Sequence, residues 1–258
     1  MPTSGNSVYH YTQEWTNFIK ILSEGFKLSY CKETIIVDDK PRTFAVPILS
    51  FCDIPLSQVK DHMLKYGRYA IGMTMEWAIQ YGLNPVLYLE SHSIVNRSLN
   101  SVLDFLHEDW HKLMDKNTFS RFYDTTYKST VCILKSIKNY GGPLTRDGRT
   151  RRYKFYDERE WRYTPVIADE HNDEYPDIFW GDEFDDLRKR FPSKPHFNKY
   201  VIPIKTKDIR HLILHSEHDI PLFIEDLKKM PHLYNDNAEE FQLLLTKIKT
   251  ATQIEEDY

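Results

Sequence analysis

The sequence predicts an α+β protein in which helices flank a mixed sheet. Short apolar segments typical of strands recur from residue 8 to residue 214, and amphipathic helical segments lie between them. Glycine is scarce, at 9 of 258 residues, and neither GxGxxG nor GxxxxGK[ST] is present. A Rossmann domain and a P-loop domain are therefore not expected. We expect a single domain over residues 1–258.

The first part of the chain alternates strands and helices. Strands are predicted at residues 8–11, 30–37, 44–52, 69–73 and 85–89. The first helix begins after Thr12, a residue suited to an N-cap, and ends at Gly25. The next helix begins at Pro55 and ends before Gly67, and a short helix covers residues 75–81.

The character of the chain changes at about residue 94. Helical periodicity over 94–140, with a second helix at about 119–139, predicts a helical hairpin inserted into the sheet. A basic turn at 146–152 then precedes a strand at 153–163, and nine of the eighteen residues in 169–186 are Asp or Glu, which predicts a solvated or disordered loop. Strands at 200–204 and 209–214 and helices at 219–230 and 236–250 complete the prediction.

Composition limits the functional classes. A net charge of -4 excludes a globally basic nucleic-acid footprint, so any such contact must be local. No apolar run reaches the ~18 residues of a membrane span, and we expect a cytoplasmic protein that contacts no membrane. Three cysteines without metal-binding spacing indicate free thiols, and His211, His215 and His218 do not converge on one face, so no metal site is predicted.

The segment Tyr153-Lys-Phe-Tyr-Asp-Glu-Arg-Glu-Trp-Arg-Tyr163 is the most informative part of the chain. In a strand, alternate side chains share a face, so Glu158, Glu160 and Arg162 would point the same way. Such a charged face is either solvated and paired across the sheet, or it lines a cleft where carboxylates act chemically.

Three short blocks resemble the ADP-ribosyltransferase superfamily, in particular its DarT-like enzymes, and occur in that superfamily's order. The first is Tyr9-His-Tyr-Thr12 before an amphipathic helix, the second is Ser50-Phe-Cys-Asp-Ile-Pro-Leu-Ser57 before a helix that ends at Tyr66-Gly67, and the third is Glu158-Arg-Glu160. The resemblance implies an ADP-ribosyltransferase-like split sheet, NAD+ as a substrate and no metal.

The resemblance also implies roles for individual residues. NAD+ would contact His10, Tyr11, Thr12, Ser50 and Tyr66, with Tyr69 as a substitute for Tyr66 and Arg42 as the counterpart of a catalytic arginine. Cleavage of the nicotinamide glycosidic bond passes through a cation-like sugar that a nearby carboxylate stabilises, and Glu160 is assigned to that position. Glu158 would position or deprotonate the acceptor.

A basic run lies directly before the two carboxylates. It comprises Arg146, Arg149, Arg151, Arg152 and Lys154. The run is either a solvated turn or a rim that contacts the phosphates of a nucleic-acid substrate or the diphosphate of NAD+, with Arg149, Arg151 and Arg152 as the substrate-binding residues.

The chain as a whole is similar to the AbiGi family of bacterial abortive-infection proteins. The similarity rests on Tyr9-His-Tyr-Thr12, Ser50-Phe-Cys-Asp-Ile-Pro55, Tyr66-Gly67, Pro85-Val-Leu-Tyr88 and Glu158-Arg-Glu-Trp-Arg162. Two functions follow from the resemblances. The first is a toxin that transfers ADP-ribose from NAD+ to a nucleic acid or, second in preference, to a protein. The alternative is a non-catalytic antitoxin or phage-sensing partner of an abortive-infection toxin.

Overall fold

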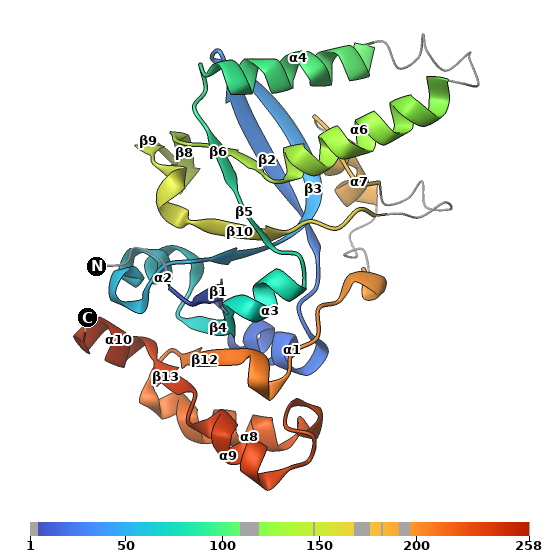
Figure 1. Cartoon of the computed structure of the whole chain (residues 1–258). Coiled ribbons are helices and arrows are strands. Elements are labelled where there is room, and N and C mark those ends of the chain that lie inside the picture. The colour runs from blue at the N-terminus through green and yellow to red at the C-terminus, as the bar shows by residue number, and fades with distance from the viewer. Residues whose placement is uncertain are drawn as a thin grey trace.

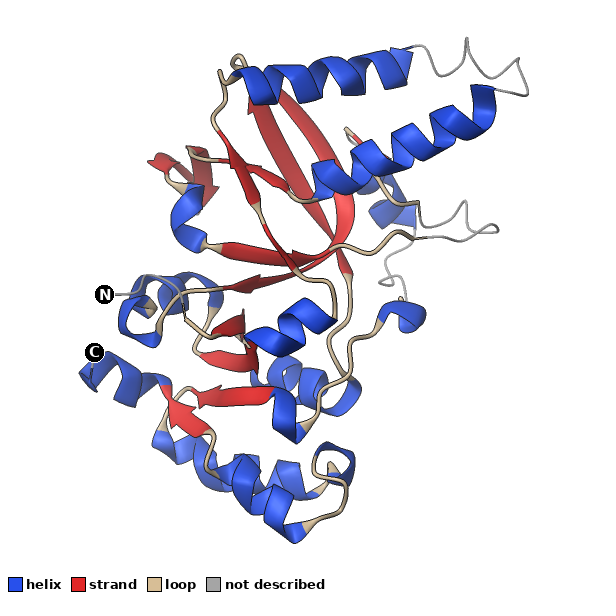
Figure 2. Cartoon of the chain, in the orientation of Figure 1, coloured by secondary structure: helices blue, strands red, loops and turns tan. Residues whose placement is uncertain are grey.

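A mixed β-sheet forms the framework of the computed structural model, which describes residues 5–108, 119–146, 148–167, 176–181, 183–190 and 197–257 (Figure 1). The main path of this sheet has the strand order β13-β12-β4-β1-β3-β10-β5. Every neighbouring pair on this path is antiparallel except β12 and β13, which are parallel. Helices flank the strands (Figure 2), and the predicted α+β class is confirmed.

The strands fall into three groups. The main path consists of β1 (Ser7–Thr12), β3 (Lys40–Cys52), β4 (Tyr69–Thr74), β5 (Asn84–Pro85), β10 (Glu160–Tyr163), β12 (Ile209–Leu214) and β13 (Ile248–Thr250). Two further strands, β2 (Ser29–Val37) and β11 (Phe179–Trp180), pair with β3. Outside this sheet, β6 (Leu87–Leu89) pairs with β7 (Ile137–Asn139), and β8 (Gly142–Arg146) pairs with β9 (Arg149–Tyr153).

Strand β3 joins the two halves of the sheet. Its first nine residues pair with β2 in continuous register, from Lys40 opposite Val37 to Ile48 opposite Ser29. Its last residues pair with β1 on one side and β10 on the other, so that Cys52 lies opposite both Tyr9 and Glu160. A single long strand therefore brings the N-terminal strand and the carboxylate-bearing strand together.

Nine helices and six short 3-10 turns are present among the described residues. The helices are α1 (Trp15–Glu24), α2 (Lys60–Tyr66), α3 (Met75–Gln80), α4 (Ile94–Glu108), α6 (Phe119–Lys135), α7 (Glu183–Arg190), α8 (Ile220–Lys228), α9 (Ala238–Leu245) and α10 (Ala251–Asp257). The 3-10 turns are η1 (Leu56–Gln58), η2 (Phe155–Glu158), η3 (Asn198–Tyr200), η4 (Thr206–Asp208), η5 (Glu217–Asp219) and η6 (Pro231–Leu233). No helix in these ranges is both long enough and apolar enough to span a bilayer.

The main core is aromatic. Phe26 packs against Phe51 and Trp77 with ring centroids 5.0 and 5.5 Å apart, and Phe18 packs against Phe223 at 5.4 Å. These five side chains are almost fully buried. Offset and edge-to-face aromatic pairs of this kind stabilise a core beyond their area burial, so they hold α1, α3 and α8 against the sheet.

Helices α4 and α6 run side by side above β2 and β3 (Figure 1). Their buried residues Leu103, Val131 and Leu134 pack onto Ile35 and Phe44 of the two strands. The predicted second helix was too long, because α6 ends at Lys135 and residues 137–139 form β7.

Asn139 gives the physical reason for this boundary. Its side chain accepts a hydrogen bond from the backbone N–H of Ile36 at 2.6 Å and donates one to the carbonyl of Ile36 at 3.0 Å. The Asn139 side chain therefore satisfies both the N–H and the C=O of Ile36 in β2. These two hydrogen bonds would be lost if the helix continued through residue 139.

Other predicted boundaries also differ from the structure. Thr12 is not the N-cap of α1, because it ends β1 opposite Tyr69 and Glu14 occupies the cap position. The predicted strand at 200–204 is reduced to one bridge between Phe26 and Ile202. The predicted helix at 236–250 ends at Leu245, because β13 follows and pairs with β12.

The two strongly charged segments are more ordered than predicted. The basic turn at 146–152 is largely the strand β9, which pairs residue by residue with β8. Part of the acidic segment 169–186 lies outside the described residues, but Phe179 and Trp180 form β11, and Glu183 begins α7. Acidic residues in a first helical turn interact favourably with the helix dipole, which explains how this acidic stretch starts a helix.

The segment 153–163 is not one continuous strand. Residues 155–158 form η2, Arg159 adopts a left-handed conformation at φ 44° and ψ 49°, and β10 begins only at Glu160. The carbonyl of Arg159 accepts a hydrogen bond from the backbone N–H of Asp53 at 3.0 Å, which fixes this turn against the end of β3. Glu158 and Glu160 therefore lie on a turn and a strand, and simple alternation does not relate them.

Gly67 ends α2 at a point where no side chain fits. Its φ is 117°, and a Cβ atom there would lie 2.1 Å from the carbonyl oxygen of Thr12. We expect Gly67→Ala to lower the free energy of unfolding by more than about 3 kcal/mol, because backbone strain and a clash with backbone add together. Urea denaturation of the purified variant measures this change.

Gly82→Ala is the matched control. Gly82 also has a positive φ, 73°, but nothing lies within 4 Å of the Cβ position. We expect Gly82→Ala to lower the free energy of unfolding by only about 1 kcal/mol, because the left-handed conformation is its one source of strain. Equal losses in the two variants would contradict the assignment of a steric clash to Gly67.

Candidate functional site

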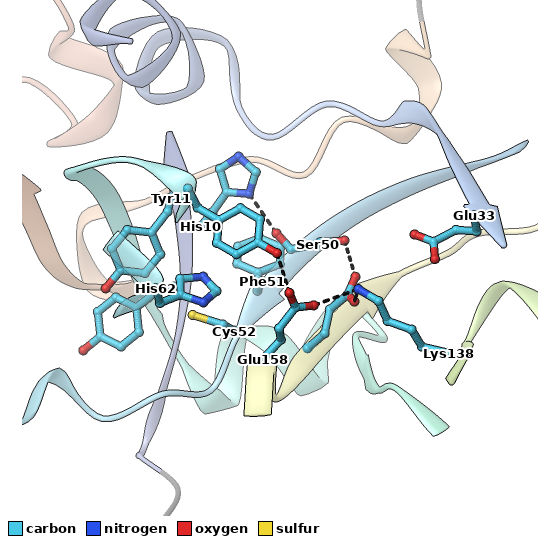
Figure 3. A pocket seen from close by; sticks show the side chains of 12 residues that line it. His10, Tyr11, Glu33, Ser50, Phe51, Cys52, His62, Lys138 and Glu158 are labelled. Atoms are coloured by element: carbon cyan, nitrogen blue, oxygen red, sulfur yellow. Dashed lines mark hydrogen bonds and ion pairs between the residues drawn. The ribbon is translucent and has the colours of Figure 1, made fainter. Parts of the chain in front are cut away.

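A pocket of about 310 Å³ opens where β1, β3 and β10 meet, beside α2 (Figure 3). Its volume is within the range of about 300–1,000 Å³ that is typical of small-molecule sites. The lining residues come from segments far apart in the sequence and are Tyr9, His10, Tyr11, Glu33, Ser50, Phe51, Cys52, His62, Tyr66, Lys138, Glu158 and Glu160. The shared register at Cys52 explains their meeting, because β1 and β10 both pair with β3 at that residue.

Half of the residues predicted to form a site lie in this pocket. The structure brings together His10, Tyr11, Ser50, Tyr66, Glu158 and Glu160. The remaining predicted residues lie elsewhere, and these are Thr12, Arg42, Tyr69, Arg149, Arg151 and Arg152. The chemical roles assigned to the residues in the pocket remain predictions.

Four donor atoms from three side chains contact the carboxylate of Glu160. Its Oε1 accepts hydrogen bonds from Arg162 Nε at 2.7 Å and Ser50 Oγ at 2.6 Å, and its Oε2 contacts Arg162 Nη2 at 3.0 Å and Lys138 Nζ at 3.1 Å. Burial opposes the negative charge, but Arg162 and Lys138 outweigh burial and lower the pKa of Glu160 to about 2. The carboxylate is therefore ionised at every physiological pH.

Arg162 is the buried cation of the site. Its side chain has no solvent exposure, and besides Glu160 it contacts Glu33 Oε1 at 3.1 Å and the carbonyl oxygen of Lys135 at 3.0 Å. Burial disfavours its charge, but the carboxylates of Glu33 and Glu160 more than offset this cost and raise the pKa of Arg162. A buried charge is tolerated because it is paired and hydrogen-bonded on several sides.

Lys138 joins the two carboxylates that the sequence singled out. Its ammonium lies 2.8 Å from Glu158 Oε2 and 3.1 Å from Glu160 Oε2. Burial disfavours the ammonium charge, but the carboxylates of Glu160, Glu33 and Glu158 raise the pKa of Lys138 overall. A cation between two close carboxylates removes the repulsion that would otherwise raise the pKa of one of them.

Glu158 reaches the pocket from η2. Its Oε1 accepts a hydrogen bond from the hydroxyl of Tyr66 at 2.5 Å, and this contact ties the end of α2 to the turn before β10. The left-handed conformation of Arg159 reverses the chain between the two carboxylates, so both line one pocket although only Glu160 is in a strand.

His10 is linked to Glu160 through Ser50. Its Nδ1 donates a hydrogen bond to the carbonyl oxygen of Ser50 at 2.8 Å, while the hydroxyl of Ser50 donates to Glu160 (Figure 3). Burial lowers the pKa of His10, which favours the neutral ring. Because a carbonyl only accepts, Nδ1 carries the proton, and Nε2 is left as a hydrogen-bond acceptor.

Aromatic rings form the other wall of the pocket. The rings of His62 and Tyr66 have centroids 4.4 Å apart, and those of Tyr11 and His62 are 5.1 Å apart. The hydroxyl of Tyr11 is buried and has no hydrogen-bond partner within the described part of the chain. Buried polar groups are normally satisfied, so this hydroxyl is a group that a polar ligand could engage.

Arg42 lies far from the pocket, and its predicted catalytic position is not supported. It pairs with Asp104 of α4, and its guanidinium lies 5.9 Å from the ring centroid of Trp180. The reason is the length of β3: Arg42 is eight residues from Ser50, and a strand rises about 3.3 Å per residue, which separates them by roughly 26 Å.

Thr12 and Tyr69 are also outside the pocket. The two residues are register partners at the end of the β1–β4 ladder, and Tyr69 packs against Trp15 with ring centroids 5.6 Å apart. The Tyr69 hydroxyl contacts Asp219 at 3.4 Å. Of the two candidate tyrosines, only Tyr66 has a position from which its ring could contact a ligand in the pocket.

Several pocket residues were not predicted. The predicted helix over 119–139 hides Lys138, and no pattern in the sequence indicates that Glu33 of β2 lies near the site, which it reaches through its contact with Arg162. Arg162 adjoins the pocket. Its position two residues after Glu160 is the one signal in the sequence that indicates a partner of that carboxylate.

No metal site was found among the described residues. No group of three or more His, Cys, Asp or Glu side chains in these ranges is arranged to hold a metal ion. His211 instead contacts the hydroxyl of Tyr9 through Nδ1 at 2.8 Å. Burial, with Lys249 and Arg210 nearby, lowers the pKa of His211 to about 4.

The comparisons with known proteins define the class. Residues 24–215 match the family described as "Putative abortive phage resistance protein AbiGi, antitoxin", and this match covers most of the chain, so the chain belongs to that family. The chain is also similar to the abortive phage resistance protein AbiGi of Lactococcus lactis subsp. cremoris. The two are 25% identical over 228 residues, which cover 83% of this chain and 89% of the relative. No solved structure matches it significantly.

Glu160→Gln tests the ion network through pH. A carboxyl whose pKa falls from 4.5 to about 2 on folding stabilises the fold above pH 4.5, and this contribution is lost as the pH falls toward 2. We expect the variant to lose about 3 kcal/mol of unfolding free energy at pH 7. The difference between wild type and variant should shrink in urea denaturation as the pH is lowered from 5 to 3.

Glu225→Gln serves as the control, because Glu225 is exposed and, within the described ranges, forms an ion pair with Lys228 alone, one helical turn away. Exposed pairs of this kind contribute little, so its curve should follow the wild type at every pH. A difference between wild type and Glu160→Gln that stayed constant with pH would show that the pKa of Glu160 is not lowered by folding.

Proposed function

We propose that this chain is the antitoxin of an abortive-infection toxin–antitoxin pair. The observation that carries the proposal is the match of residues 24–215 to a family whose description contains the word antitoxin. The relative from Lactococcus lactis is named as an abortive phage resistance protein, which supports a role for this chain in the same kind of defence. In this role the chain binds a cognate toxin, and its pocket need not perform a reaction.

The charge state of the pocket supports a non-catalytic role. An efficient general acid or base has a pKa near the working pH, whereas the pKa of Glu160 is about 2. Both oxygens of Glu160 are also occupied by Arg162, Lys138 and Ser50. Such a network can hold β10, β3 and β7 in fixed positions without taking part in proton transfer.

Expression in bacteria tests the antitoxin proposal. We expect the chain to be harmless when it is induced alone and to restore growth when it is co-induced with the toxin of the same defence locus. Colony counts with each gene alone and with both genes measure this effect, and co-purification of a tagged chain detects the complex. Growth arrest by the chain alone would refute the proposal.

A second function is favoured by a specific observation. His10, Tyr66 and Glu160, which come from three distant parts of the chain, line the same pocket. This convergence supports an ADP-ribosyltransferase-like sheet in which NAD+ donates ADP-ribose to a nucleic acid or a protein. A permanently ionised Glu160 suits electrostatic stabilisation of a cation-like sugar, which requires charge and not proton transfer.

The other pocket residues can be assigned within this second proposal. Tyr66 offers an aromatic face for the positively charged nicotinamide ring. His10 offers Nε2 as an acceptor for a ribose hydroxyl. Glu158 is already paired with Lys138 and Tyr66. These two contacts would have to loosen before Glu158 could take a proton from the nucleic acid or protein that receives ADP-ribose.

Incubation of purified protein and cell lysate with labelled NAD+ tests the second function. If the chain transfers ADP-ribose, Glu160→Gln is expected to lower the initial rate per folded molecule by about 10²–10³-fold. Asp177→Asn is the matched control, because it removes the carboxylate partner of the buried Lys135 outside the pocket and so accounts for loss of stability. Equal rates in wild type and Glu160→Gln, or no labelling by the wild type, would exclude this function.

A further inference from the structure

The β8–β9 hairpin carries a row of arginines at the surface. Arg149, Arg151 and Arg152 belong to the five-residue strand β9, and all three side chains are exposed. Within the described ranges none of these guanidinium groups has a hydrogen-bond or ion-pair partner. In a chain with a net charge of -4, this is a local site of unneutralised positive charge.

The arginines face a hollow that is separate from the carboxylate pocket. The hollow has a volume of about 840 Å³ and lies between β9 and α2, where Asp61, Leu64 and Lys65 complete its lining. The ammonium of Lys65 lies 4.2 Å from the ring centroid of Tyr153 and 2.7 Å from its hydroxyl. Among the residues that the structure describes, the walls therefore carry four cationic side chains, Lys65 and the three arginines, and one carboxylate, that of Asp61.

Two exposed tyrosines lie at the base of the same hairpin. Tyr140 is 42% exposed and lies two residues before β8, and Tyr156 is 48% exposed and lies three residues after β9. Their ring centroids are 5.4 Å apart with an interplanar angle of 31°. The ammonium of Lys154 lies 5.5 Å and 5.4 Å from the two centroids. Accessible aromatic rings beside a cation are suited to stacking with nucleic-acid bases.

We propose that the β8–β9 hairpin and the adjoining edge of α2 bind single-stranded nucleic acid. Phosphates contact the arginines of β9 and Lys65, and bases stack on Tyr140 and Tyr156. Backbone neutralisation and stacking together are the means by which proteins bind single strands without reading sequence. Two other anionic ligands fit the surface less well. An acidic protein would use the arginines but not the stacking rings, and a duplex does not expose the faces of its bases to Tyr140 and Tyr156.

This inference does not depend on the antitoxin proposal or on transfer from NAD+. The arginines and the two tyrosines do not line the carboxylate pocket. Tyr156 shares a neighbouring hollow with Glu160. Loss of nucleic-acid binding would leave the antitoxin proposal and transfer to a protein standing, and failure of either functional proposal would leave the hairpin to be tested by itself.

Fluorescence anisotropy of the full chain with a labelled single-stranded RNA of about 20 nucleotides tests the proposal. The variant R149Q/R151Q/R152Q is expected to weaken binding and to reduce the slope of log affinity against log salt by about 2, because each phosphate contact contributes about 0.7 on a single strand. K205Q/K207Q/R210Q removes the same charge from exposed positions in or near β12, which lies well apart from β8 and β9 (Figure 1), and should bind like the wild type.

The tyrosines provide a second readout. Tyr140→Ala and Tyr156→Ala are each expected to lower the affinity about tenfold while leaving the salt slope unchanged, because stacking involves no counterion release. Unlabelled single-stranded DNA should compete with the RNA. Unchanged affinity in the arginine variant, competition by duplex DNA as strong as by a single strand, or displacement by polyglutamate at equal charge would overturn the proposal. Circular dichroism confirms that each variant is folded.

Discussion

The buried guanidinium of Arg162 is the group on which the rest of the site depends. It binds Glu160 on its own strand, Glu33 on β2 and the backbone of Lys135 at the end of α6. An unpaired buried charge is costly, so these partners must all be in place when the chain is folded. One side chain thus fixes three segments that adjoin the pocket.

Lys138 and Glu158 extend this network to the opposite wall. Lys138 bridges the two carboxylates, and Glu158 holds the hydroxyl of Tyr66 at the end of α2. Because α6 leads directly into β7, the helical hairpin and the pocket are mechanically connected through residues 135–138.

The hairpin β8–β9 is organised on a different principle. The two cations on Glu160 are paired, with Arg162 buried and Lys138 half-buried, whereas Arg149, Arg151 and Arg152 are exposed and unpaired among the described residues. Buried pairs fix a structure, and exposed unpaired charges remain available to an external anion. The protein thus has two charged regions with opposite uses, one that holds the fold and one that faces solvent.

The sequence by itself determined the α+β class and the position of most strands and helices, because local periodicity and the capping glycines act over a few residues. It also identified His10, Tyr66 and Glu160 as candidates. Only the tertiary structure decided that they share a pocket with Lys138 and Glu33 and that Arg42 does not. These outcomes depend on the register at Cys52, on the length of β3 and on the left-handed turn at Arg159, which are set by long-range pairing that no local pattern encodes.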